Sequence, residues 1–451
     1  MSFEALLGQY QQAIPRYTSY PTVPNWLKWE DSSIWQNELK RAAASYNVSE
    51  GIALYLHLPY CEHLCTYCGC NKKITTNHAV EQPYIKRILE EWKRYTAIFK
   101  EHLLIRELHL GGGTPTFFAP KALKELVNGI FSSAKAHAEL EMSFEGHPNN
   151  TTFEHLRVLH ELGFNRVSYG VQDLDPEVQR VINRIQPLDS LVDTTRMARS
   201  LGYQSVNYDL VYGLPLQDEI KLSKTLQEVI KLRPDRVAFY GYAHVPWKSR
   251  AQRLYDETDL PDAHTRLKLY QLGRRAFLEN GYAEIGMDHF ALPNDALAHA
   301  QKQGRLHRNF MGYTTSNSSI LIGLGVSAIS DLGFAFAQNS KELGLWERAV
   351  DEQAFAVDKG FLLSADDEKR RDLILNMSCN GSATLEANWQ FEPHQQALLE
   401  QMQTDGLLSI QHNKLQLSEG AQPFTRHACS LFDAYLDAPS LRVGKQFSQA
   451  V

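Results

Sequence analysis

The sequence predicts an α/β protein, a partial (β/α) TIM-like barrel with a small helical C-terminal domain. Short apolar runs rich in β-branched and aromatic residues recur along the first half of the chain, with amphipathic helical segments between them. Cysteines, glycines and polar side chains stand where these runs end. Alternating strands and helices produce parallel strands, and a series of this length favours a barrel or partial barrel over an open sheet.

The expected strands begin with "IALYLHL" at 52–58 and end with "DRVAFYGYA" at 235–243. The others are expected at 105–110, 140–145, 166–172 and 205–213. Helices are expected at 79–99, 120–137 and 189–203, where apolar residues recur at three-and-four spacing with charges between them. Because the carboxyl ends of the strands in a parallel barrel meet at one face, we expect the residues that follow each strand to form the site.

Near residue 360 the sequence pattern changes to amphipathic helical segments with short connectors. Helices are expected within 364–379, 393–408 and 424–436. A chain of 451 residues is too long for one compact core of ordinary size. We therefore expect an N-terminal segment at 1–50 that covers the substrate, the barrel at 51–355 and a helical C-terminal domain at 356–451.

Composition and charge are those of an ordinary globular protein. Hydrophobic residues make up 43% and charged residues 22% of the chain, and the net charge is −6. This charge gives no general attraction to nucleic acid or to an anionic membrane, so neither partner is expected. With no signal-peptide pattern and no apolar run as long as a bilayer span, we expect a cytoplasmic protein that acts as a monomer.

Four of the six cysteines stand in the ten-residue stretch "CEHLCTYCGC", directly after the first expected strand. Four thiolates could hold a structural zinc ion, although zinc sites usually draw close pairs from separate loops. "CTYC" alone could be a redox dithiol. Three thiolates on one loop could instead hold three irons of a cubane cluster and leave the fourth iron open to a small molecule. The spacing favours the cluster over zinc, and zinc over a redox pair.

The spacing C-x-x-x-C-x-x-C, with the aromatic Tyr67 before its last cysteine, resembles the signature of radical S-adenosylmethionine (SAM) enzymes. Further segments narrow the resemblance: "PRYTSYPT", "GGGTPT", "GVQD", "NRIQ", "NYDLVYGLP", "YAHVP", "GMDHFA", "HRNFMGYTT" and the extra Cys70. Together they look like the family of oxygen-independent coproporphyrinogen III oxidases (dehydrogenases). The resemblance covers essentially the whole chain.

The resemblance implies an oxidoreductase of haem and porphyrin biosynthesis. Such an enzyme converts two propionates of coproporphyrinogen III to vinyl groups without oxygen, giving protoporphyrinogen IX by 5′-deoxyadenosyl radical chemistry. Its cofactors would be a 4Fe–4S cluster and two molecules of SAM, and its partners the porphyrinogen and a cellular electron donor. A haem-binding chaperone and a haem-degrading radical SAM enzyme are related alternatives. The chaperones generally lack the equivalents of Cys70 and of "PRYTSYPT", which this chain has.

The resemblance also assigns site residues. The cluster ligands would be Cys61, Cys65 and Cys68, with Cys70 beside them as a catalytic and cofactor-binding residue of unspecified role. The first SAM would be lined by Tyr55, Gly112, Glu145 and Ile329. The second SAM would contact Gly113, Thr114, Gln172, Arg184, Asp209 and Ala243, and Tyr67 would also lie at the cofactor.

Chemical character supports some of these assignments. A glycine-rich turn after a strand lets the backbone approach a ligand closely, as the amino acid end of SAM requires. Glu145 could accept from an ammonium or a ribose hydroxyl, and Arg184 could bind a carboxylate. The segment "EGHP" departs from the family, which commonly has Asp or Asn where this chain has His147.

Coproporphyrinogen III carries four propionates, so its site requires several fixed cations or donors. The candidates are Arg16, His289, His307 and Arg308, because they stand in segments that resemble family motifs. Cys379 and Cys429 stand in helical, partly apolar text and are expected to be ordinary buried thiols.

Overall fold

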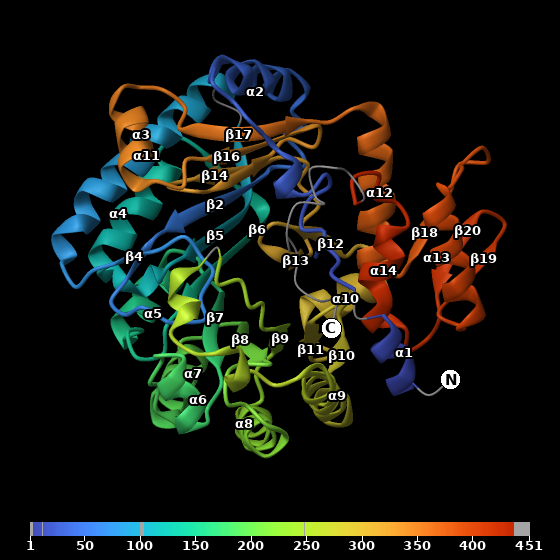
Figure 1. Ribbon diagram of the computed structural model, residues 1–451. Coiled ribbons are helices and arrows are strands. Elements are labelled where there is room, and N and C mark those ends of the chain that lie inside the picture. Colours follow the sequence, from blue (N-terminus) through green and yellow to red (C-terminus); the bar gives the residue numbers. More distant parts are fainter. Residues whose placement is uncertain (1–2, 11, 100–102, 248, 437–451) are drawn as a thin grey trace. The chain divides into compact units, whose positions relative to one another are not determined.

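The computed structural model describes residues 3–10, 12–99, 103–247 and 249–436, shown in Figure 1. Packing divides the chain into two compact units. Unit 1 consists of Met1–Trp26, Leu210–Thr315 and Leu363–Val451, and unit 2 of Leu27–Asp209 and Ser316–Leu362. The segments 1–50, 51–355 and 356–451 remain a prediction about functional parts along the chain.

Unit 2 is built on parallel strands, as the sequence predicts. Their order is β14 (Leu321–Leu324), β2 (Ile52–Leu58), β5 (Leu104–Gly112), β6 (Lys135–Gly146) and β7 (Arg166–Gln172). The residues of β8 (Ser205–Tyr212) up to Asp209 also belong to this unit. On the other side of β14, antiparallel strands follow: β15 (Ile329–Asp331), β16 (Ala335–Asn339), β17 (Val357–Leu362) and β1 (Leu27–Lys28).

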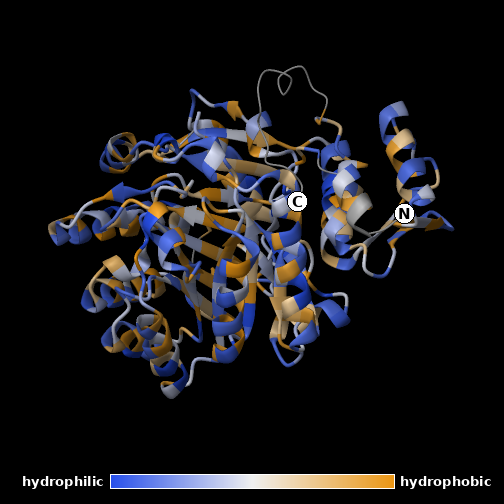
Figure 2. Cartoon of the chain, turned by 60° about the horizontal axis from the view of Figure 1, so that its bottom comes forward, coloured by the Kyte–Doolittle hydropathy of each residue, from blue (hydrophilic) through white to orange (hydrophobic). Residues whose placement is uncertain are grey.

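Amphipathic helices accompany these strands. They are α2 (Ser33–Ser45), α3 (Glu81–Phe99), α4 (Pro120–Phe131), α5 (Phe153–Glu161), α6 (Pro176–Val181), α7 (Leu188–Ser200) and α11 (Leu343–Asp351), with the 3-10 turns η2 (His78–Val80) and η4 (Pro115–Phe117). Helix α3 buries Tyr84, Ile88 and Trp92, which recur at four-residue spacing on one face. Figure 2 shows the same pattern as apolar colour on the strands and mixed colour on the helices.

Helix α4 is shorter than the sequence predicts. The helix expected over 120–137 ends at Phe131, and strand β6 starts at Lys135. Lys135 pairs with Leu104 of β5, and its N–H donates to the carbonyl of Leu103 at 3.0 Å. These hydrogen bonds to a distant strand override the local helical pattern.

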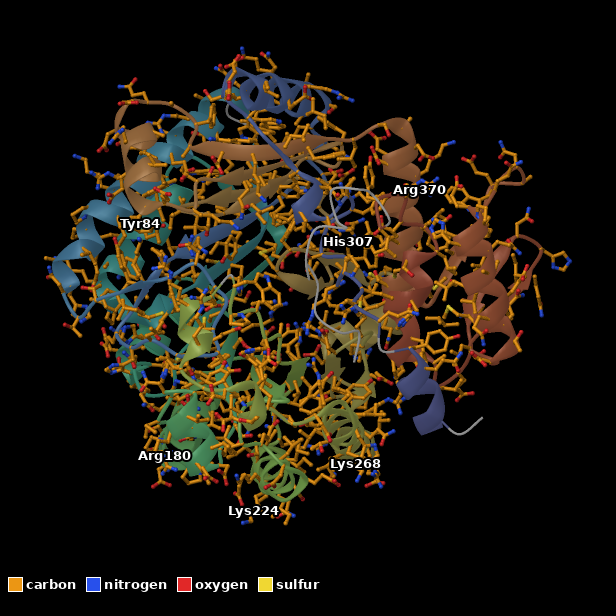
Figure 3. All side chains as sticks on the ribbon, viewed as in Figure 1. Tyr84, Arg180, Lys224, Lys268, His307 and Arg370 are labelled. Atoms are coloured by element: carbon orange, nitrogen blue, oxygen red, sulfur yellow. The ribbon has the colours of Figure 1, made fainter. Side chains whose placement is uncertain are left out.

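Two polar side chains of α3 fasten the helix to the strands of unit 2. The Tyr84 hydroxyl, labelled in Figure 3, donates to the carbonyl of His57 at 2.8 Å and accepts from the N–H of Val326 at 3.1 Å. The carboxylate of Glu91 accepts from the N–H of Gly325 at 2.8 Å and from the Asn339 amide at 2.7 Å. Buried polar groups are thus paired where the helix meets the sheet.

Unit 1 combines three separate parts of the chain. Its strands are β9 (Arg236–Gly241), β10 (Ala283–Glu284), β11 (His289–Ala291) and the hairpin β12 (His307–Asn309) with β13 (Gly312–Thr314). Its helices in this part are α1 (Phe3–Gln9), α8 (Glu219–Leu232), α9 (Ala263–Glu279) and α10 (Ala296–Lys302), with the 3-10 turns η1 (Val23–Asn25), η5 (Arg250–Arg253) and η6 (Glu257–Asp259).

The C-terminal part of unit 1 contains the three predicted helices. They are α12 (Ala365–Asn380), α13 (Pro393–Thr404) and the shorter α14 (Thr425–Ser430), which follows the 3-10 turn η7 (Gln422–Phe424). A three-stranded sheet that the sequence did not predict joins them, in the order β18 (Ser382–Thr384), β20 (Lys414–Leu417) and β19 (Leu408–Gln411). Within the described ranges, no helix has both the length and the apolar character that a membrane crossing requires.

The N-terminal segment of unit 1 is held by side chains from the C-terminal part. Arg426 donates to the carbonyl of Pro15 at 3.2 Å, and the Tyr17 hydroxyl donates to Asp433 at 3.0 Å. Tyr17 and Arg426 are both buried. The segment that carries "PRYTSYPT" is therefore part of a packed core.

Candidate active site

The cysteine loop starts where strand β2 ends. Its base is closed by β3 (Tyr60–Cys61), which pairs in parallel with β4 (Lys73–Ile74). The N–H of Thr75 donates to the carbonyl of Cys61 at 2.9 Å. Cys61, Cys65 and Cys68 are half-buried, and Cys70 is exposed. The loop therefore holds its thiols at the surface of unit 2 on a fixed base.

Two cations lie beside the three predicted cluster ligands. A 4Fe–4S cluster takes each thiolate on a different iron. Arg184 donates to Cys65 Sγ at 3.5 Å, and Lys72 Nζ donates to the carbonyl of Cys68 at 2.9 Å. These two cations favour an anionic cluster at the loop.

The thiols differ in acidity. Burial raises the pKa of Cys61 to about 11, although its sulfur lies 3.3 Å from the Thr114 hydroxyl. A hydrogen bond with Cys70 lowers the pKa of Cys68 to about 6 and raises that of Cys70. Within this pair, Cys70 therefore holds its proton more tightly than Cys68 does.

The glycine turn at the end of β5 is packed against the start of the cysteine loop. Gly112 has φ +118°, and a Cβ there would lie 2.8 Å from the His57 ring. A Cβ on Gly113 would lie 2.5 Å from the carbonyl oxygen of Pro59. Only glycine fits either position, so the backbone passes close to the cysteine loop and presents its amide groups there.

Glu145 extends from the end of β6 toward this turn. Its Oε2 accepts from the N–H of Gly112 at 3.2 Å, and its Oε1 lies 3.5 Å from His109 Nε2. The Tyr55 ring stacks on His109 at 6.0 Å between centroids, and the Tyr55 hydroxyl lies 3.0 Å from His57 Nδ1. The structure thus brings together three of the residues predicted for the first SAM.

Ile329 lies on β15, and β14 separates this strand from β2, which carries Tyr55. Gly323 of β14 pairs with Tyr55 of β2, and a Cβ on Gly323 would meet the Ile329 carbonyl oxygen at 2.3 Å. The backbone of Ile329 therefore lies directly against the strand next to Tyr55. The side chain offers only shape to a ligand.

Arg184 and Gln172 converge at the end of β7. Arg184 Nη2 donates to the carbonyl of Gly170 at 2.6 Å, and a Cβ on Gly170 would lie 2.7 Å from Gln172 Nε2. Gln172 has φ +64°, a left-handed conformation that is uncommon for residues other than glycine and often found at functional sites. The buried Arg184 Nε has no hydrogen-bond partner among the described residues.

The segment around Arg184 is fixed to the cysteine loop. The Asn183 amide donates to the carbonyl of Leu64 at 2.8 Å, and the N–H of Thr66 donates to the carbonyl of Ile182 at 3.0 Å. Tyr67 lies beside Arg184, and burial raises the pKa of its phenol. The loop and the predicted second SAM position are therefore held as one piece.

Asp209 is held by its neighbours on two strands. It accepts from the Ser168 hydroxyl at 2.9 Å and from the Asn207 amide at 2.9 Å. The two donors also bond to each other at 2.7 Å. This network fixes the carboxylate that is predicted to accept from ribose hydroxyls.

His147 stands where the resembled family commonly has Asp or Asn, and its ring accepts a hydrogen bond of the kind that those side chains accept. Its Nδ1 accepts from the N–H of Asn149, two residues later, at 3.1 Å. An Asp or Asn side chain makes the same bond in an Asx turn. The departure therefore keeps the turn after Glu145.

The remaining predicted residues belong to unit 1. Arg16 and His289 both bond to Asp288, at 3.1 and 2.7 Å, and Arg308 donates to the carbonyl of Tyr17 at 3.3 Å. His307 lies in the hairpin strand β12. The carbonyl of Ala243 accepts a hydrogen bond from Gln252 at 3.3 Å. Cys379 and Cys429 are buried, free thiols, as predicted.

Sequence reasoning missed two histidines of the site, His57 and His109. Each stands two residues from another polar residue on the same strand face: Tyr55 with His57 in β2, and Glu107 with His109 in β5. Ser143 with Glu145, and Asn207 with Asp209, repeat the pattern. A polar residue at every second position of successive strands is the signal that could have found them.

Comparison with known proteins identifies the family of the chain. Residues 55–229 match the model of the radical SAM superfamily. The chain is 36% identical over 460 residues to the oxygen-independent coproporphyrinogen III oxidase of Pseudomonas aeruginosa, covering 99% of this chain and 98% of that protein. Against the Escherichia coli protein of the same name, identity is 37% over 455 residues, with the same coverage.

A solved structure gives the same result. The solved structure of coproporphyrinogen III oxidase (HemN) from Escherichia coli, described as a radical SAM enzyme, superposes with a TM-score of 0.87 at 36% identity. The match covers 94% of this chain and 100% of that one.

The parallel strands, the cysteine loop at their carboxyl ends and the superfamily match define a radical SAM enzyme with a partial TIM-like barrel. A 4Fe–4S cluster and SAM are accordingly its cofactors, and the zinc and redox-dithiol interpretations are set aside. Within that superfamily, the chain belongs to the oxygen-independent coproporphyrinogen III oxidases.

Proposed function

We propose that this chain oxidises coproporphyrinogen III without oxygen, converting two propionates to vinyl groups and giving protoporphyrinogen IX. The observation that carries the proposal is similarity across 99% of the chain to oxidases of this name, because it includes unit 1 as well as the cysteine loop. A protein that shared only the radical SAM region could act on many substrates.

The residues of unit 2 have separate roles in this proposal. Cys61, Cys65 and Cys68 hold the cluster. Tyr55, Gly112, Glu145 and Ile329 line one SAM, and Gly113, Thr114, Gln172, Arg184 and Asp209 contact a second. When bound, the cluster and SAM supply the adenosyl radical that removes a hydrogen from the β-carbon of a propionate.

The chain itself positions the cofactor groups. Glu145, held by Gly112 and near His109, accepts hydrogen bonds at its carboxylate oxygens, which suits a SAM ammonium or ribose. Arg184 keeps its Nε available for an anionic group, which suits a SAM carboxylate. Cys70 stands next to the cluster ligands at an exposed position, and we place it in the catalytic site.

The partners follow from the same reaction. Coproporphyrinogen III is the substrate, with Arg16, His289, His307 and Arg308 as candidate contacts. A cellular electron donor supplies the electron that SAM cleavage consumes, and an electron acceptor takes the electron that the substrate loses with each CO₂. We propose a cytoplasmic monomer that binds neither nucleic acid nor membrane.

The test is anaerobic incubation of reconstituted protein with SAM, a reductant and coproporphyrinogen III labelled at its propionate carboxyls. We expect labelled CO₂ and protoporphyrinogen IX from the wild type and neither from Cys65→Ser. Return of the porphyrinogen with all four propionates would refute the proposal. Haem bound or degraded by that preparation would favour the related chaperone or haem-degrading activity.

A further inference from the structure

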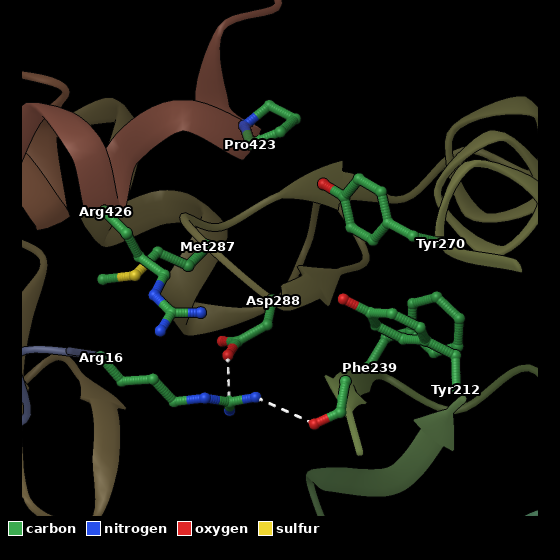
Figure 4. Close-up of a pocket in the computed structure, with 9 residues that line it drawn as sticks. Arg16, Tyr212, Phe239, Tyr270, Met287, Asp288, Pro423 and Arg426 are labelled. Atoms are coloured by element: carbon green, nitrogen blue, oxygen red, sulfur yellow. Dashed lines mark hydrogen bonds and ion pairs between the residues drawn. The ribbon is translucent and has the colours of Figure 1, made fainter. Parts of the chain in front are cut away.

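A small pocket inside unit 1 is lined by side chains from three separate parts of the chain (Figure 4). Arg16 comes from the N-terminal segment, Tyr270 from α9, Asp288 from the turn before β11, and Arg426 from α14. The pocket volume is about 30 Å³. One water molecule needs roughly 10–15 Å³, so the pocket has room for a carboxylate and not for a macrocycle.

Its single acidic lining residue is already shared. Asp288 Oδ2 accepts from Arg16 at 3.1 Å, and its Oδ1 bonds to His289 Nδ1 at 2.7 Å. Burial alone would raise the pKa of Asp288, but His289, Arg16 and Arg308 lower it, so this carboxylate stays ionised. It can balance about one of the positive charges around it.

Two further guanidinium groups stand around the same space. Arg426 lines the pocket and donates to the backbone carbonyls of Ile14 and Pro15. Arg266 lies against Gly241 of the pocket wall, where a Cβ would be 2.9 Å from its Nη2. Burial and the charge of Arg16 lower the pKa of Arg426 to about 9 and also lower that of Arg266. Buried positive charge is therefore in excess here, a condition that favours an anion.

The pocket also contains a donor without a partner. Tyr270 is 4% exposed, and its hydroxyl has no hydrogen-bond partner among the described residues. In Figure 4 this hydroxyl points away from α9 into the space beside Asp288 and Pro423. Arg266 Nε is likewise buried without a partner in the described chain. Buried donors are normally satisfied, so these two indicate a ligand that accepts hydrogen bonds.

We propose that this pocket is a subsite for one carboxylate of the substrate, held by Arg16 and Arg426 and by a hydrogen bond from Tyr270. The inference rests on the proposed function, since coproporphyrinogen III offers a propionate carboxylate of the right size and charge. The Arg16 side chain is 32% exposed, so the pocket reaches the surface there and a propionate can enter with the macrocycle outside.

The decisive variant is Tyr270→Phe, because it removes only an unpartnered hydroxyl. We expect its Tm to match that of the wild type and its KM for coproporphyrinogen III to rise about tenfold, as loss of a hydrogen bond to a charged group predicts. The control is Tyr282→Phe, whose hydroxyl donates to the carbonyl of Pro234 at 2.7 Å, outside the pocket lining. It should lower the Tm and leave KM unchanged.

A second arm does not depend on turnover. Sodium propionate should raise the Tm of the full-length wild type more than that of Tyr270→Phe, whereas neutral propionamide should raise neither. If the wild type converts coproporphyrinogen III but Tyr270→Phe has an unchanged KM, the subsite is wrong and the proposed function stands. If the wild type does not convert the substrate, the proposed function fails. Separately, an equal rise in Tm with sodium propionate in the wild type and in Tyr270→Phe would overturn the subsite.

Discussion

The Oε2 atom of Glu145 accepts a hydrogen bond from the N–H of Gly112 at 3.2 Å, which joins the carboxyl ends of β6 and β5. The other carboxylate oxygen lies 3.5 Å from His109 Nε2. The Glu145 side chain is still 42% exposed. Its carboxylate is therefore oriented by the protein and yet open to a ligand, as a SAM-binding group must be.

We expect Glu145→Gln to weaken SAM binding about tenfold or more, because a hydrogen bond to a charged group is worth roughly 1.5–3 kcal/mol. The cluster should assemble normally, since Glu145 is not a ligand. The measurement is the Kd for SAM on reconstituted protein. Glu139→Gln is the control, because Glu139 is on the same strand, pairs with Arg106 and has a side chain that is 70% exposed. Equal losses in the two variants would contradict the assignment.

Gly113→Ala should disturb the cysteine loop. The new methyl would lie 2.5 Å from the Pro59 carbonyl oxygen, which is backbone and cannot rotate away. Overpacking of this kind costs about 1–3 kcal/mol. We expect a lower Tm and less iron bound per chain.

Gly69→Ala is the matched control for Gly113→Ala. Gly69 stands in the cysteine loop, and a Cβ there would have nothing within 4 Å. Iron content and Tm should equal those of the wild type. Loss of iron in this variant, with retention in Gly113→Ala, would mean that the close packing of the glycine turn is unimportant.

The thiols should separate by function. Cys65→Ser is expected to lose the cluster, measured as iron, sulfide and absorbance near ~400 nm, because only three thiolates ligate it. Cys70→Ser is expected to keep the cluster and lose most decarboxylation. A full cluster in Cys65→Ser would disprove the ligand set, and normal activity in Cys70→Ser would remove that residue from the site.

Glu91 should make the stability of the protein depend on pH. Burial raises its pKa to about 7, although the Gly325 amide, Asn339 and Trp346 donate to it. The folded state thus binds the Glu91 proton more tightly than the unfolded chain does. The contribution of this proton to the free energy of unfolding is therefore full below about pH 4.5 and is lost as pH rises through 7. The shift corresponds to roughly 3 kcal/mol.

The measurement is the free energy of unfolding of wild type and Glu91→Gln between pH 5 and 8. Glutamine cannot ionise, so the free energy of unfolding of the variant should depend less on pH. It should also be lower by a constant amount at every pH, because the amide does not match the hydrogen bonds of the carboxylate. Glu90→Gln, at a position whose side chain is 44% exposed, should keep the wild-type slope. A wild-type slope in Glu91→Gln would show that Glu91 does not titrate in this range.

Much of unit 2 was predictable because its signals are local. The apolar runs at 52–58 and 166–172 form strands with the predicted bounds, and the cysteines follow a strand as expected. The strand expected at 140–145 begins earlier, at Lys135, and its first residues were missed because they pair with β5, which lies far away in the sequence. Propensity describes a segment and not its partner.

The sequence indicates candidate site residues only where a motif marks them. Spacing indicates Cys61, Cys65 and Cys68 as cluster ligands and resemblance indicates Glu145, and these assignments stay predictions. Arg426 lies in an ordinary helical sequence pattern. No local signal shows that its side chain donates to the carbonyl of Pro15, more than 400 residues away in the sequence. Contacts of this length depend on the whole fold.

The central claim is that this chain uses one adenosyl radical for each of two propionates of one porphyrinogen. A product balance tests this claim most directly. Each conversion removes one hydrogen and releases one CO₂, so each should consume one SAM. With coproporphyrinogen III under anaerobic conditions, we predict about two 5′-deoxyadenosine and about two CO₂ per protoporphyrinogen IX. SAM cleavage that proceeds with no loss of CO₂ from the porphyrinogen would contradict the account.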